Sequence, residues 1–285
     1  MSGSIGPKRP PAVAGMFYPD NVKELEQIID LSFRNSRFGP GRPPPSDKKR
    51  KIYGIVSPHA GYVYSGSVAA NGFFEISSLD FHDVIMVGPN HYGIGKGVAI
   101  MREGVWETPL GEVQVNSQLA QEIASKSSVT DFDDSAHTKD HCLEVQIPFL
   151  QYIKEEIRIV PIILIMQDID TAFDLGKAIA DVVAEKIDST LLIASSDLTH
   201  YEPNAEAHRK DGELMKAVMA LDVHKFYAVL ERFDVSACGY GAIASIMVAA
   251  KSLGATSGEL LRYATSGDVT GDSSAVVGYS SIVFV

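Results

Sequence analysis

The stretch TLLIASSDLTH, residues 190–200, contains the pattern that determines the fold class. Its first five residues are apolar or β-branched, and the run ends abruptly in polar residues and a histidine. A short apolar run of this kind is typical of a strand buried on both faces of a parallel sheet. Similar runs occupy residues 52–56, 84–87 and 159–164, so the sequence predicts several such strands.

Helical patterns separate these runs along the chain. After a cap at Asp20-Asn21, residues 22–33 repeat apolar side chains at helical spacing. Further helical patterns cover residues 68–74, 143–152, 173–187 and 206–219, and a last apolar run covers residues 276–285. The alternation predicts an α/β fold with a central, largely parallel or mixed sheet flanked by helices. No linker or repeat divides the chain, so residues 1–285 are expected to form one domain, with a Pro-rich basic loop at 39–51.

The composition of the chain excludes several kinds of binding partner. The 25 Lys and Arg residues against 36 Asp and Glu residues give a formal net charge of −11. This charge repels nucleic acids and anionic membrane surfaces, so neither is an expected partner. The basic run 48–51 is therefore interpreted as a solvated loop rather than a binding patch. Two cysteines, no signal-peptide pattern and no apolar run long enough to span a bilayer favour a cytoplasmic protein.

A histidine lies just beyond three of the predicted strands: His59, His91 and His200. Ligands of open α/β sheets bind beyond the carboxyl ends of the strands, so these histidines are expected to converge on one site. The alternative for each is a loop histidine bonded to the main chain. The histidines that follow no strand are expected outside the site: His82, His208 and His224. His137, which lies in a loop, is expected to be intermediate between these and the histidines of the site.

Two further places carry candidate site residues. If a helix begins near Asp140, then His141 and Glu144 lie one turn apart on one face, where the carboxylate either orients the histidine or caps the helix. Cys238 precedes a helical pattern rich in small residues, and a cysteine at a helix N-terminus has a lowered pKa. The alternative for Cys238 is a buried, inert thiol.

Six blocks, in this order, resemble those of the Memo family, and the resemblance covers the chain from Pro10 onward. The blocks are Ala14-Gly15-Met16-Phe17-Tyr18-Pro19, Pro58-His59-Ala60-Gly61-Tyr62, Gly88-Pro89-Asn90-His91, His141-Cys142-Leu143-Glu144-Val145-Gln146-Ile147-Pro148-Phe149, Ser195-Ser196-Asp197-Leu198-Thr199-His200-Tyr201 and Cys238-Gly239. The chain resembles the archaeal-type members, and the resemblance implies association with a radical-SAM protein.

The resemblance also implies a fold similar to that of class III extradiol dioxygenases, which are nonheme iron enzymes. His59 and His91 match the two metal-binding histidines, and Cys238 stands where the dioxygenases have a carboxylate ligand. His200, with Asp197 beside it, matches the catalytic acid/base histidine. Because thiolate is a softer ligand than carboxylate, the implied metal is iron(II) or copper, and no nucleotide cofactor is expected.

The sequence also departs from the family blocks. Asp140 and Cys142 stand where Glu and Ser are common, which keeps charge and size. Tyr240 stands where Arg often follows Cys-Gly, and the loss of a guanidinium argues against phosphopeptide binding.

Two functions are expected from this site. The first is a metal-dependent oxidoreductase that uses His59, His91 and Cys238 as ligands and His200 with Asp197 for proton transfer. The second is a binding module that accepts a small molecule or a (phospho)peptide side chain without turnover. Residues expected to line or support the pocket are His141, Glu144, Tyr18 and Tyr64. A hydrolase built on Ser195 or Ser196 is disfavoured, because the flanking glycines of a nucleophile elbow are missing.

Overall fold

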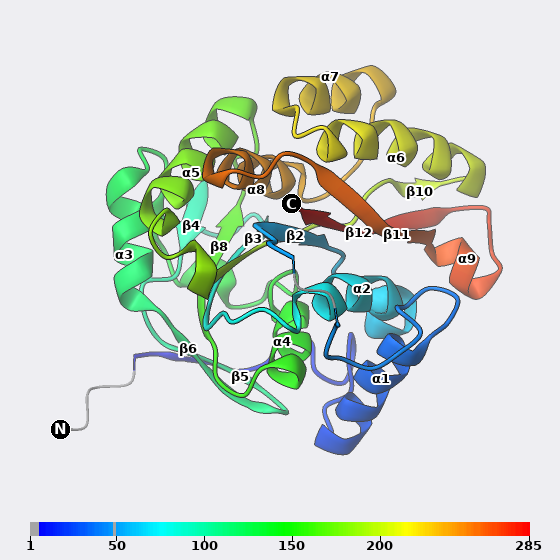
Figure 1. Cartoon of the computed structure of the whole chain (residues 1–285), viewed down its shortest axis with the longest axis horizontal. Helices are drawn as coiled ribbons and strands as arrows, with labels where there is room; N and C mark the ends of the chain where they lie inside the picture. The colour runs from blue at the N-terminus through cyan, green and yellow to red at the C-terminus, as the bar shows by residue number, and fades with distance from the viewer. Residues whose placement is uncertain (1–5, 48–49) are drawn as a thin grey trace.

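The structure is a computed structural model that describes residues 6–47 and 50–285. Strands and helices alternate along the chain, and the described residues build a 12-stranded mixed sheet with helices on both faces (Figure 1). The α/β class with a central mixed sheet, predicted from the sequence, is confirmed. Two residues of the predicted basic run, Lys48 and Lys49, lie outside the described residues.

Four parallel strands form the centre of the sheet. In spatial order they are β8 (Arg158–Leu164), β3 (Asp83–Pro89), β9 (Thr190–Ser195) and β2 (Gly54–Ser57). These are the four runs predicted as buried strands, and in β3 and β9 every residue is buried. Ile193 of β9 lies opposite Ile55 of β2 on one side and Met86 of β3 on the other. The carboxyl ends of all four strands therefore meet at one edge.

Further strands, parallel and antiparallel, extend the sheet on both sides. Beyond β2 lies β12 (Val276–Phe284), which pairs with β11 (Gly258–Thr265) and β10 (His200–Glu202). Beyond β8 lie the hairpin strands β6 (Gly111–Val115) and β5 (Val105–Thr108), and then β1 (Lys8–Arg9). Two short strands, β4 (Val98–Ile100) and β7 (Asp131–Phe132), lie off this order. The sequence predicted β12, but not the hairpin β5–β6 or β11.

The helices cover the two faces of the sheet, and the alternation along β3 shows which helices lie on which face. Ile85 and Val87 pack with α3 (Ser117–Lys126), α5 (Ile169–Val183), α6 (Asn204–Met219), α7 (Val223–Phe233) and α8 (Tyr240–Leu253). Val84 and Met86 point to the opposite face and pack with α1 (Val22–Arg34), α2 (Ser67–Ile76) and α4 (Ile147–Ile153). A last short helix, α9 (Ser266–Thr270), lies beside β12 (Figure 1).

One predicted helix begins later than the sequence pattern indicated. Residues 143–152 were expected to be helical, but α4 begins at Ile147, and Glu144–Gln146 form a 3₁₀ turn. Pro148 lies in the first turn of α4, where its fixed φ and missing N–H suit a helix start. The prediction that His141 and Glu144 share one helical face is therefore wrong. His141 lies in a turn before the helix, which allows its side chain a different direction.

Within residues 6–47 and 50–285, none of the helices combines the length and the apolar composition that a bilayer crossing requires.

The close contact between α5 and α8 generates a stability prediction. A Cβ atom at Gly176 of α5 would lie 2.5 Å from the Ser245 main-chain oxygen of α8 and 2.6 Å from Val248 Cβ. Gly176→Ala should therefore destabilise the protein by about 1–3 kcal/mol, although alanine favours helices. Chemical denaturation measures the change.

Gly212 of α6 provides the matched control, because a Cβ atom there meets nothing within 4 Å. Gly212→Ala should raise the free energy of unfolding by about 0.5–1 kcal/mol. An increase in the free energy of unfolding in both variants would show that α5 and α8 are not in close backbone contact.

Candidate metal centre

The position of His59 follows from the pairing of β2 with β9. Ser57 lies opposite Ser195, so His59, two residues further on, reaches the level of Asp197. The His59 backbone N–H donates to Asp197 Oδ1 at 2.8 Å, and the ring Nδ1 lies 3.0 Å from Ser195 Oγ. The imidazole is buried, with 2% of the residue exposed. Two hydrogen bonds across the strand ends thus fix the ring in place.

The tautomer of His59 follows from the hydrogen bonds of Ser195. The Ser195 hydroxyl donates to the Cys142 main-chain oxygen at 2.6 Å and accepts from Gln146 Nε2 at 2.9 Å. Its only proton is therefore used, so it accepts a second hydrogen bond, from Nδ1–H of His59. The proton on Nδ1 leaves a lone pair on Nε2. His59 is thus arranged to present Nε2 to a metal ion or a proton donor.

His91 is oriented by a carboxylate in the same way. Its backbone N–H donates to Asp140 Oδ2 at 2.6 Å, and its Nδ1 lies 3.1 Å from Asp140 Oδ1. Burial acts to raise the pKa of Asp140, but the hydrogen bonds from His91 and Cys142 hold that pKa well below its usual value. The carboxylate stays ionised and accepts Nδ1–H, so Nε2 is the nitrogen of His91 that remains for another partner. A carboxylate behind a histidine is a common support of metal ligands.

Three imidazoles converge at the carboxyl edge of the sheet. The ring of His59 lies 5.2 Å from that of His91 and 5.4 Å from that of His141, at interplanar angles of 86° and 84°. The rings of His91 and His141 stack at 4.5 Å and 22°. One ring nitrogen from each of the three lies within 4.8 Å of the others, which brings them close enough to hold one metal ion.

Cys238 lies beside His59 at the start of α8. Its Sγ is 3.1 Å from His59 Nε2 and 3.3 Å from the backbone N of Asp197. Burial raises the pKa of the Cys238 thiol, and burial together with the neighbouring histidines lowers the pKa of His59. Both groups are therefore neutral without a metal, and the thiol donates to Nε2. The lowered pKa expected from a helix N-terminus is wrong, because burial outweighs the effect of the helix.

The donor set fits a transition metal. His59 and His91 each have Nδ1 committed to a hydrogen bond, so Nε2 is the ring nitrogen that a metal ion would bind. Burial, followed by the effect of His91, also lowers the pKa of His141 to about 4, so this ring is neutral at pH 7. A thiol that can lose its proton adjoins His59. Such nitrogen and sulfur donors suit iron, copper and zinc.

His200 and Asp197 lie at the same edge. The ring Nδ1 of His200 lies 2.7 Å from the oxygen of Leu198 and 2.9 Å from that of Ser236, so it carries a proton and Nε2 is an acceptor. Burial raises the pKa of Asp197 to about 6, although hydrogen bonds from His59 and the nearby His200 oppose the shift. A carboxyl group with a pKa near 6 fits the requirement for general acid–base catalysis near neutral pH.

Glu144 binds the N-terminal segment and is fully buried. It accepts hydrogen bonds from Arg9 Nη1 at 2.6 Å, Tyr18 Oη at 2.6 Å and the backbone N–H groups of Ala12 and Val13. Tyr18 is itself buried and points at Glu144, whereas Tyr64 is 44% exposed. Of these residues, Tyr64 has its side chain available to a ligand from solvent.

Arg9 joins the N-terminal segment to the turn that carries Asp140. Its Nε donates to the oxygen of His137 at 2.6 Å, and its Nη2 donates to the oxygen of Asp140 at 2.7 Å. The guanidinium also lies over the ring of Trp106, 3.9 Å from the centroid. Strand β1 was not predicted, and no local pattern marks Arg9, because its partners lie more than a hundred residues away in the sequence.

The remaining histidines lie outside the cluster. His137 is buried beside Trp106 and is not among the three converging rings. The others contact separate groups: His82 the oxygen of Ser189, His208 the carboxylate of Asp268, and His224 the ring of Phe173.

The hydroxyls considered for a hydrolase are committed to the main chain. Ser195 donates to the oxygen of Cys142, and Ser196 donates to the oxygen of Asp197. Both residues are fully buried, so neither presents a nucleophile to a substrate.

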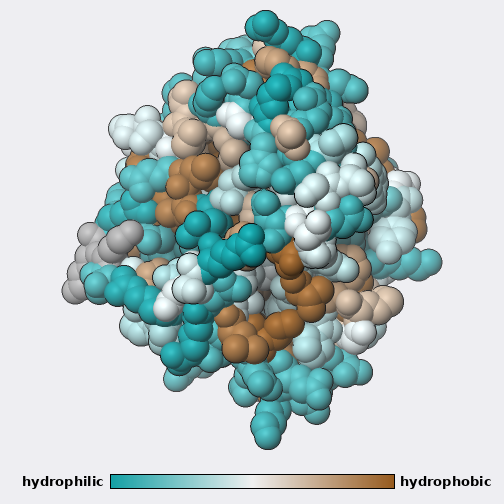
Figure 2. All heavy atoms as spheres, turned by 90° about the vertical axis from the view of Figure 1, so that its right-hand side faces the viewer, coloured by the Kyte–Doolittle hydropathy of each residue, from teal (hydrophilic) through white to brown (hydrophobic). Residues whose placement is uncertain are grey.

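Exposed apolar side chains follow the carboxyl ends of the strands. They lie in the segments after β2, β3, β8 and β9 and in the N-terminal loop: Val63, Tyr64, Tyr92, Ile94, Ile165, Met166, Tyr201 and Met16. Figure 2 shows hydrophobic side chains in an arc around a hollow on one face of the molecule. Isolated exposed apolar residues are ordinary, but their concentration on the loops of one edge indicates a contact surface.

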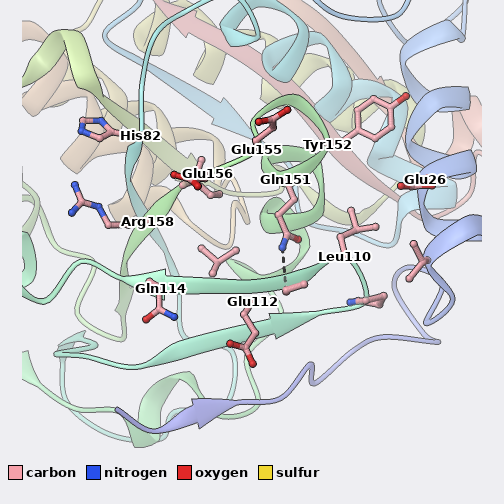
Figure 3. Close-up of a pocket in the computed structure, with 15 residues that line it drawn as sticks. Glu26, His82, Leu110, Glu112, Gln114, Gln151, Tyr152, Glu155, Glu156 and Arg158 are labelled. Atoms are coloured by element: carbon pink, nitrogen blue, oxygen red, sulfur yellow. Dashed lines mark hydrogen bonds between the residues drawn. The ribbon is translucent and has the colours of Figure 1, made fainter. Parts of the chain in front are cut away.

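A separate cleft of about 1200 Å³ lies between β6 and the end of α4 (Figure 3). Its lining includes Glu26, His82, Glu156 and Arg158, and none of the converging histidines. Because the cleft contains none of the donor groups described above, the chemistry of the centre does not involve it.

Comparison with known proteins identifies the family. The profile of the Memo-like protein family matches residues 9–283. The chain belongs to the Memo family. A MEMO1 family protein of Nitrosopumilus maritimus is 50% identical over 97% of this chain and 99% of its own length. Similar proteins of Methanopyrus kandleri and Thermotoga petrophila are 46% and 44% identical, again over 97% of this chain and 99% of their own length. The Memo resemblance seen in the sequence is thus confirmed.

The buried pair Arg9–Glu144 generates a second stability prediction. Arg9→Ala leaves the carboxylate of Glu144 buried without its counter-charge, which should lower the free energy of unfolding by about 3–5 kcal/mol. Arg34→Ala, which removes an exposed ion pair with Asp30, is the control and should have little effect. Chemical denaturation of the wild type and the two variants measures both changes in the free energy of unfolding. Equally small changes in Arg9→Ala and Arg34→Ala would show that the buried ion pair does not anchor the N-terminal segment.

His137 generates a prediction about pH. Burial, followed by the charge of Arg9, lowers the pKa of His137 to about 3, from an unfolded value of 6.5. Below pH 6.5 the unfolded chain binds a proton on His137 that the folded protein excludes. The contribution of His137 to the free energy of unfolding is therefore complete above pH 6.5. It falls by about 1.4 kcal/mol per pH unit towards pH 3. His137→Leu should flatten this fall between pH 6.5 and pH 5. Denaturation midpoints at these two pH values measure the slope, and identical slopes in both proteins would contradict the assignment.

Proposed function

We propose that this Memo family protein is a metal-dependent oxidoreductase whose iron(II) or copper ion is held by His59, His91 and Cys238. The observation that carries the proposal is the arrangement of the two imidazoles, each with Nδ1 bound to a fixed acceptor, with the Cys238 thiol beside Nε2 of His59. The likeness to class III extradiol dioxygenases, implied by the sequence, supports the same reaction class. The metal, when bound, supplies electron transfer and activation of oxygen or substrate.

The residues around the ligands have separate roles in this proposal. His59 and His91 bind through nitrogen, and Cys238 must lose its proton before it binds through sulfur. His200 accepts a proton on Nε2 while its Nδ1–H remains bonded to main-chain oxygens. Asp197, with a pKa raised to about 6 by burial, exchanges a proton with the substrate or with His200. Glu144 holds the N-terminal segment against the turn that carries Asp140.

The proposal is tested first by metal analysis of protein purified without chelators or nickel columns. Anaerobic loading with iron(II), followed by oxygen consumption in the presence of catechols, then tests turnover. Bound metal with turnover supports an oxidoreductase. Protein that binds neither iron nor copper contradicts the proposal.

The exposed apolar residues favour a second function, a binding module. Tyr64 and Tyr201, at 44% and 79% exposure, offer contacts to a small molecule or a peptide side chain at the mouth of the site. A module of this kind binds its ligand without turnover. Metal occupancy without oxygen consumption by any catechol, together with ligand binding that is lost in Tyr201→Ala, would favour it over the enzyme.

The role of Cys238 generates a prediction for three variants. Cys238→Ser should lose copper(I) affinity far more than Cys142→Ser, because the Cys142 thiol is buried and donates to the oxygen of Pro89 at 3.1 Å. Cys238→Glu should shift selectivity towards iron(II), because carboxylate is a harder ligand. Anaerobic titration with both metals measures the affinities. Equal affinities of the wild type and Cys238→Ser would show that Cys238 has a packing role.

Metal binding should also weaken as the pH falls, because protons compete for the sulfur and the imidazole nitrogens. Titrations at pH 8 and pH 6 measure this dependence. A metal affinity independent of pH would contradict thiolate and imidazole ligation.

A further inference from the structure

We infer that His141 is a direct metal ligand, the third imidazole of a site formed with His59 and His91. The inference rests on the proposed metal site and extends it, because the sequence pointed to a supporting role for His141. One ring nitrogen from each of the three residues lies within 4.8 Å of the other two. Nitrogens bound to one ion lie somewhat closer than this, so small side-chain rotations bring them into its coordination shell.

The hydrogen-bond state of His141 differs from that of its neighbours. In the described part of the chain, neither ring nitrogen has a partner at hydrogen-bond distance, and the nearest carboxylate, of Asp140, lies 3.9 Å from Nδ1. The side chain is only 16% exposed. Since no protein group among the described residues binds either ring nitrogen, none of them competes with a metal ion for the imidazole.

The backbone and the ring of His141 are held in place without a metal. Arg9 Nη2 binds the oxygen of Asp140, the residue before it, and Val145 N–H donates to the oxygen of His141 at 3.1 Å. The Phe17 ring lies 4.5 Å from the imidazole on one side, and His91 lies 4.5 Å away. The three nitrogens are therefore close to their binding arrangement in advance, which reduces the cost of ordering them.

Two donor sets share His59. The set His59, His91 and His141 contains nitrogen alone, whereas Cys238 Sγ adjoins Nε2 of His59 at 3.1 Å and lies outside the three-nitrogen group. Imidazole suits divalent ions such as iron(II), cobalt(II) and zinc, and thiolate suits copper(I). For a divalent ion such as iron(II), His141 therefore adds a nitrogen ligand to those from His59, His91 and Cys238. Its removal should affect cobalt(II) far more than copper(I).

Cobalt(II) is the probe, because its visible absorption bands report the number and type of its ligands. Wild-type protein, His141→Ala, His91→Ala and Cys238→Ser are titrated anaerobically with cobalt(II) and copper(I). Removal of a residue that supports a ligand lowers metal affinity by about 10- to 100-fold. The inference expects cobalt(II) affinity to fall by more than about 100-fold in His141→Ala, as in His91→Ala, with little change for copper(I). His82→Ala, outside the cluster, is the matched control.

Chemical rescue separates ligation from structural support. In His141→Gly the space between Phe17 and His91 admits free imidazole, which should restore the wild-type cobalt(II) spectrum and affinity. Wild-type affinity and an unchanged spectrum in His141→Ala, or no rescue in a folded His141→Gly protein, would overturn the inference while the metal site stands. Failure of the wild type to bind either metal would overturn the proposed function as well.

Discussion

The parallel register of β2, β9 and β3 is the constraint on which the site depends. Because Ile193 lies opposite both Ile55 and Met86, the three strands end at nearly the same level. The segments that follow are too short to travel far, so His59, Asp197 and His91 meet at one edge, as expected for open α/β sheets. A shift of one residue in any of these pairings would send the strand's buried side chains to the opposite face. The hydrophobic core thus sets the position of the polar centre.

A second layer of interactions determines the chemical state of the imidazoles. Ser195 and Asp140 act as acceptors for Nδ1–H groups, and each is in turn held by main-chain or side-chain donors. The effect is that His59 and His91 keep their protons on Nδ1. Burial then lowers the pKa of His59, so a proton does not compete with a metal on Nε2 near neutral pH. The strands thus set the positions of the imidazoles, whereas the residues in the turns beyond the strands set their tautomer and charge.

The sequence predicted the part of this arrangement that depends on local pattern. Apolar runs marked the central strands, and the histidines that follow these strands lie at the edge where the strands end. The surroundings of Glu144 could not be predicted, because Arg9, Ala12, Val13 and Tyr18 approach it from the other end of the chain. The direction of His141 was also missed. The sequence pattern predicts a helix over residues 143–152, whereas α4 begins at Ile147 and leaves His141 in a turn.

The presence of a thiol rather than a carboxylate at position 238 has a physical reason in this site. A carboxylate there would adjoin Asp197, whose own pKa burial already raises to about 6, and two buried acids in contact resist simultaneous ionisation. A thiol remains neutral and donates to His59 Nε2, so the metal-free centre has no unpaired charge at this point. A metal ion would displace that proton and bind both atoms that now share it.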